Sequence, residues 1–63
     1  MLRNGITVNA AKRQMKKYGW WKFSKEQAFD SGEVNIHYSN GGDKLTLFFD
    51  KNKRLAKIML CEC

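Results

Sequence analysis

The residues best equipped for chemistry are the cations and tryptophans that lie between positions 12 and 25. The predicted binding residues are Lys12, Arg13, Lys16, Lys17, Trp20, Lys22 and Lys25. Cationic side chains bind phosphates, and an exposed indole ring can stack on a nucleic-acid base. The first 25 residues carry seven of the 12 Lys+Arg and none of the 6 Asp+Glu. This distribution predicts a basic surface that attracts a nucleic acid or an acidic protein surface.

The sequence offers little for catalysis or for metal binding. His37 is the one histidine, and Cys61 and Cys63 are the two cysteines, so the chain is short of the four ligands that a structural zinc ion needs. We interpret His37 as a solvated side chain on a strand, because no nucleophile and orienting group accompany it. Cysteines separated by one residue are poorly placed to bridge each other, which favours reduced thiols. We expect no enzyme activity, no metal and no cofactor.

A helix is predicted from Thr7 to Tyr18. The apolar residues Val8, Ala11, Met15 and Tyr18 are spaced by three, four and three positions, which places them on one stripe of a helix. Thr7 is a suitable N-cap, or Asn9 if the helix begins later. The neighbouring cations repel one another, so packing of the apolar stripe must stabilise this helix.

A second, short helix is predicted over residues 24–30. Ser24 and Gln27 have the spacing of a capping box, and Gly32 follows as a stop signal. The competing interpretation is a strand through residues 20–23, whose aromatic side chains favour β-structure. At least one of the two adjacent tryptophans is expected in the core.

A β-hairpin is predicted over residues 33–49. Apolar and polar residues alternate in Glu33–Ser39 and again in Lys44–Phe49, and the Gly41-Gly42 pair lies between them. A period of two with a glycine turn is typical of paired antiparallel strands. The inward-facing residues are then Val34, Ile36, Tyr38, Leu45, Leu47 and Phe49.

Residues 54–61 are interpreted as a third strand, because a hairpin alone is only marginally stable. Ala56, Ile58 and Leu60 would join the buried face, whereas Phe48 and Met59 would lie on the opposite face. The expected fold is a single α+β domain over residues 1–63, with two N-terminal helices on one face of a three-stranded antiparallel meander (ααβββ). The alternative is αβββα, because Leu55, Ile58 and Met59 also suit a C-terminal helix.

Two functional hypotheses follow from these surfaces. The first is a non-enzymatic nucleic-acid-binding protein that uses the basic helix face. The alternative is a small inhibitor or adaptor of the kind that phages and mobile elements direct against a host nuclease or defence complex, docking through Phe48 and Met59. The same sheet face could also support a homodimer. The chain has no long apolar run and no apolar leader at its start, so we expect a cytoplasmic protein that does not enter a membrane.

Overall fold

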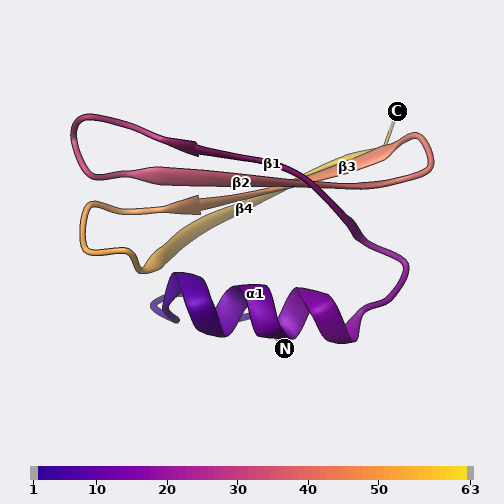
Figure 1. Cartoon of the computed structure of the whole chain (residues 1–63), viewed down its shortest axis with the longest axis horizontal. Coiled ribbons are helices and arrows are strands. Elements are labelled where there is room, and N and C mark those ends of the chain that lie inside the picture. The colour runs from indigo at the N-terminus through magenta and orange to yellow at the C-terminus, as the bar shows by residue number, and fades with distance from the viewer. Residues whose placement is uncertain (1, 63) are drawn as a thin grey trace.

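The computed structural model describes residues 2–62, which form one helix and four strands (Figure 1). The elements in chain order are α1 (Val8–Lys17), β1 (Lys22–Ala28), β2 (Val34–Asn40), β3 (Asp43–Phe49) and β4 (Leu55–Glu62). The strands form one antiparallel sheet in the order β1-β2-β3-β4, so each strand pairs with its neighbour in sequence. Figure 1 shows α1 lying along one face of this sheet, in a second layer. Within residues 2–62, no helix is long and apolar enough to cross a membrane.

The first helix is confirmed. Thr7 is its N-cap, and the Thr7 hydroxyl accepts a hydrogen bond from the Ala10 N–H over 3.2 Å. Ala11 and Met15 are completely buried against the sheet, and Val8 is half-buried beside them. The apolar stripe therefore attaches a highly cationic helix to the core.

The prediction of a second helix over residues 24–30 is wrong, because residues 22–28 form the edge strand β1. The capping-box signal is local, whereas the free edge of β2 offers this segment a row of backbone partners from Lys22 to Ala28. Ser24 is the extra residue of a β-bulge, since Phe23 pairs with Tyr38 and Lys25 pairs with His37. Both expected architectures, ααβββ and αβββα, are therefore replaced by one helix followed by four strands.

The hairpin of β2 and β3 is confirmed, with its expected inward face. The two strands pair along their whole length, from Val34 opposite Phe49 to Asn40 opposite Asp43. All six of the expected inward-facing residues are buried. Gly41 has a φ of +63°, a conformation that glycine adopts without strain.

The last segment is a strand as expected, but its inward face differs. A second bulge at Ala56 lets Leu55 pair with Phe49, and Leu55 is buried while Ala56 is exposed. Ile58 and Leu60 pair with buried residues of β3 and so lie on the helix side of the sheet, yet they are 42% and 53% exposed. The expectation that these two residues belong to the core is wrong, because a single helix leaves this part of β4 uncovered.

The segment that precedes α1 is bound to the beginning of β4. The Gly5 N–H donates to the Leu55 carbonyl over 2.7 Å, and the Leu55 N–H donates to the Ile6 carbonyl over 2.8 Å. Ile6 and Leu2 pack against the core from this side. The N-terminal end of α1 is thereby fixed relative to the sheet.

Candidate nucleic-acid interface

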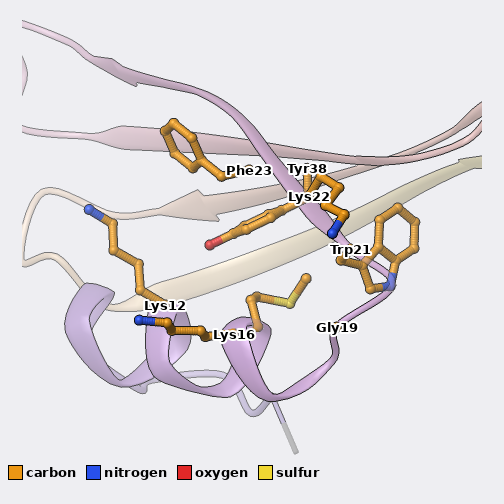
Figure 2. A pocket seen from close by; sticks show the side chains of 8 residues that line it. Lys12, Lys16, Gly19, Trp21, Lys22, Phe23 and Tyr38 are labelled. Atoms are coloured by element: carbon orange, nitrogen blue, oxygen red, sulfur yellow. The ribbon is translucent and has the colours of Figure 1, made fainter.

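An open groove of about 420 Å³ lies between α1 and the edge strand β1. Figure 2 shows its lining, which comes from the helix, from the loop after the helix and from the first two strands. The lining residues are Lys12, Met15, Lys16, Gly19, Trp21, Lys22, Phe23 and Tyr38. Three of these eight residues are cationic, three are aromatic and none is acidic.

The helix supplies one wall of the groove. Lys12 and Lys16 are one turn apart and lie next to the buried stripe, on the flank of α1 that faces β1. The backbone N–H of Trp21 donates to the Tyr18 carbonyl over 3.0 Å, which shapes the short connection to β1. Trp21 is half-buried against the core, so it serves the expected structural role of one tryptophan while lining the groove.

The strands supply exposed aromatic surface. The ring of Phe23 is 58% exposed and packs edge-to-face on Tyr38, with 6.1 Å between ring centroids and an interplanar angle of 83°. Trp20 is 59% exposed and lies against Tyr18 just beyond the end of α1, with 5.6 Å between centroids. Phe23 and Trp20 therefore both offer accessible ring surface to a ligand.

A salt bridge sits at the wall of the groove. The Lys12 Nζ lies 2.6 Å from the Glu26 Oε1. Burial of the Tyr38 ring, and in second place the negative charge of Glu26, raise the pKa of the Tyr38 hydroxyl. Figure 2 shows this hydroxyl directed into the groove between Phe23 and Lys12, where it remains a protonated hydrogen-bond donor.

The structure gathers only part of the predicted site at the groove. Arg13 and Lys17 are exposed on the side of α1 that faces away from Ala11 and the sheet. Lys25 belongs to the other face of the sheet, where it pairs with His37. The cationic helix face and Lys25 therefore point in different directions.

Sequence reasoning missed Phe23, Tyr38 and Glu26 as parts of this site. The available signal was the alternation of Trp21 and Phe23, which favoured a strand and would have placed both rings on one face. Alternation alone would place Lys25 on the same face as these rings. The extra residue Ser24 shifts the pattern by one position, so Glu26 takes that place instead.

Phe48 and Met59 lie on the sheet face that points away from α1, here called the outer face. Their β-partners are Lys57 for Phe48 and Thr46 for Met59. The Lys57 ammonium lies 5.6 Å from the centroid of the Phe48 ring, and Met59 is 51% exposed. The ammonium over the ring partly covers Phe48 and adds a charge to this face.

Residues 2–62 contain no group of three or more His, Cys, Asp and Glu side chains that could hold a metal ion. Cys61 is disulfide-bonded, which corrects the expectation of a reduced thiol at that position. Cys63 lies outside the described residues, so the expectation for its thiol remains untested.

Comparison of the chain with protein-family models, with curated proteins and with solved structures finds no match.

Proposed function

We propose that this protein binds single-stranded nucleic acid, without catalysis, in the groove between α1 and β1. The observation that carries the proposal is the exposed Phe23 ring in a groove that also presents Lys16 and Lys22. Phosphates of a strand would contact the ammonium groups, and a base would stack on the ring. This combination is the usual chemistry of single-strand binding.

The aromatic contribution favours a single strand over a duplex. The bases of a duplex are stacked on one another, so their faces are closed to a protein side chain. A duplex could use the ammonium groups of the groove but not Phe23. We therefore expect a single strand to bind more tightly than the duplex of the same sequence.

The direct test is fluorescence anisotropy with labelled single-stranded DNA, single-stranded RNA and the matched duplexes, at several salt concentrations. We expect saturable binding that weakens with salt, by roughly 0.7 in log affinity per log salt for each phosphate contact on a single strand. Equal affinity for single strand and duplex would contradict the stacking argument. No binding to any of these nucleic acids would reject the proposed function.

Two pairs of variants locate the interface. Lys16→Glu should weaken binding strongly, whereas Lys51→Glu makes the same charge change in the β3–β4 turn and serves as its control. Phe23→Ala should cost about 1–3 kcal/mol of binding, the usual value for one stacked base. Phe29→Ala removes another exposed phenylalanine, 43% exposed in the turn after β1, and should leave binding unchanged.

A protein inhibitor or adaptor that docks through Phe48 and Met59 is the second candidate function. The exposure of Met59 favours it, since methionine is enriched in protein interfaces. The partial cover of Phe48 by Lys57 weighs against it, because a desolvated aromatic anchor would need that ring free. Met59→Glu should abolish such docking while leaving nucleic-acid binding in the groove intact.

A further inference from the structure

The outer face carries a second cationic hollow, separate from the groove between α1 and β1. This hollow has a volume of about 250 Å³ and is lined by Ser24, Lys25, His37, Tyr38, Ser39 and Lys44. The strand register explains the grouping, because Lys25 pairs with His37 and Ser39 pairs with Lys44. Two ammonium groups are thereby placed at a hollow that also contains two serine residues and an imidazole.

No carboxylate from the strands shares this face. Glu26 pairs with the buried Ile36, so it points toward α1. Asp43 and Glu62 pair with each other, and Asp43 lies two residues before the buried Leu45 on the same side of the sheet. Among the strand residues that the structure describes, the charged groups of the outer face are therefore cations.

His37 adds an unsatisfied polar atom at the hollow. Its Nδ1 lies within hydrogen-bond distance of the Thr46 Oγ1, at 3.0 Å. Its Nε2 is shielded from solvent and has no hydrogen-bond partner in the protein. When the Thr46 hydroxyl donates to Nδ1, the Nε2 carries the proton and needs an acceptor. The exposed ammonium groups of Lys25 and Lys44 are the part of the hollow that a phosphate oxygen can reach, and the shielded imidazole lies beside them.

We propose that this hollow is a phosphate-binding subsite, and that a single strand in the groove continues around β1 to reach it. The inference rests on the proposed function. The two hollows lie on opposite sides of the edge strand, and Tyr38 contributes to the lining of both. Lys22 lines the groove and pairs with Ser39 of the hollow, and Lys25 follows three residues later on β1, so cations border this edge strand at both hollows.

Oligonucleotide length separates the subsite from the groove. A strand of about 4 nucleotides can occupy the groove alone, whereas one of about 12 can reach the outer face, within the usual range of site sizes. We expect Lys44→Glu to lower the affinity of the longer strand about tenfold and to change that of the shorter strand less than about twofold. Lys51→Glu controls for net charge, and circular dichroism of each variant checks the fold.

Three outcomes distinguish the subsite from the function on which it rests. If wild type binds both strands and Lys44→Glu changes neither, the subsite is rejected and the groove stands. If Lys44→Glu lowers the affinity for both strand lengths equally, the proposal that only the longer strand reaches the outer face is also rejected. If wild type binds no strand, the proposed function and the strand path fail together.

A titration with inorganic pyrophosphate tests the anion chemistry without nucleic acid. We expect the imidazole NMR signals of His37 to shift during the titration in wild type and not in Lys44→Glu. If this shift occurs in a protein that binds no strand, the hollow recognises a free phosphate compound instead. If the signals do not move in wild type, the subsite is overturned.

Discussion

The Lys12 ammonium and the Glu26 carboxylate lie 2.6 Å apart and join α1 to the edge strand β1. Their side chains are 42% and 37% exposed, so the salt bridge adds at most about 1 kcal/mol to stability. Its larger effect is on binding, because Glu26 occupies a cation at the place where a phosphate would bind. Glu26 is therefore an internal competitor of the proposed ligand.

Glu26→Gln should tighten nucleic-acid binding. The substitution frees Lys12 for a phosphate contact and should steepen the plot of log affinity against log salt by about 0.7 for a single strand. Anisotropy titrations over a range of salt concentrations measure both quantities. Glu62→Gln makes the same change in net charge on β4 and should leave the slope unaltered. Weaker binding in Glu26→Gln would show that the salt bridge organises the groove instead of competing with the ligand.

The stability of the protein should fall at alkaline pH because of Tyr38. Burial first, and Glu26 second, raise the pKa of this phenol in the folded protein. Above the ordinary tyrosine pKa of about 10, the unfolded chain loses the proton before the folded protein does. The stabilising effect is therefore complete below that pH and declines as the pH rises through the folded-state pKa. Urea unfolding at increasing pH should show this decline in wild type and a smaller one in Tyr38→Phe.

Phe48→Glu and Leu47→Glu should behave oppositely. Leu47 is fully buried, and an unpaired charge there should unfold the domain. Phe48 faces outward beside its partner Lys57, so a glutamate gains a cross-strand ion pair and should cost about 1 kcal/mol or less. Thermal unfolding followed by circular dichroism measures both. Unfolding of Phe48→Glu would mean that the outer face is covered in solution, for instance by a second copy of the chain.

Thr7→Ala should destabilise the protein by about 1 kcal/mol, the usual cost of losing an N-cap. The reason is that the Ala10 N–H loses its bond to the Thr7 hydroxyl. Thr7→Ser keeps a hydroxyl acceptor and should retain most of the stability. Denaturant unfolding of the three proteins provides the comparison, and equal losses in the two variants would assign the effect to the lost methyl group.

The confirmed elements are those whose signals are local. Positions 34–39 alternate strictly, positions 44–49 alternate except at Phe48, and a glycine pair lies between them; the helix has both its cap and its stripe within about three turns of chain. Strand β1 has a weaker signal, because the alternation of Trp21 and Phe23 reaches only its beginning and the exposed residues from Lys22 to Ala28 show no burial pattern that continues this period. Residues 22–28 form a strand because the free edge of β2 offers them backbone hydrogen bonds, which is an effect of tertiary structure. Ile58 was misplaced for a related reason, since its burial depends on how many helices cover the sheet.

The composition of the site was predictable to a similar extent. The cations of the helix and their association with aromatic rings followed from residue types. The bulge at Ser24 was not visible in the sequence, and it reverses the facing of the residues that follow. Without that extra residue, Lys25 would face the helix and Glu26 would face outward. One inserted residue thus distributes the positive charge over two faces.

The backbone pairing of Gly5 and Ile6 with Leu55 also constrains the order of folding. During synthesis the helix emerges early, but the strand that anchors its leading end emerges almost fifty residues later. Because α1 is strongly cationic and only marginally stable without packing, it should remain a fluctuating segment on the nascent chain until β4 is made. The groove between α1 and β1 should therefore form only after residue 55 has joined the sheet, so a basic fragment that ends upstream of it should lack the proposed nucleic-acid binding.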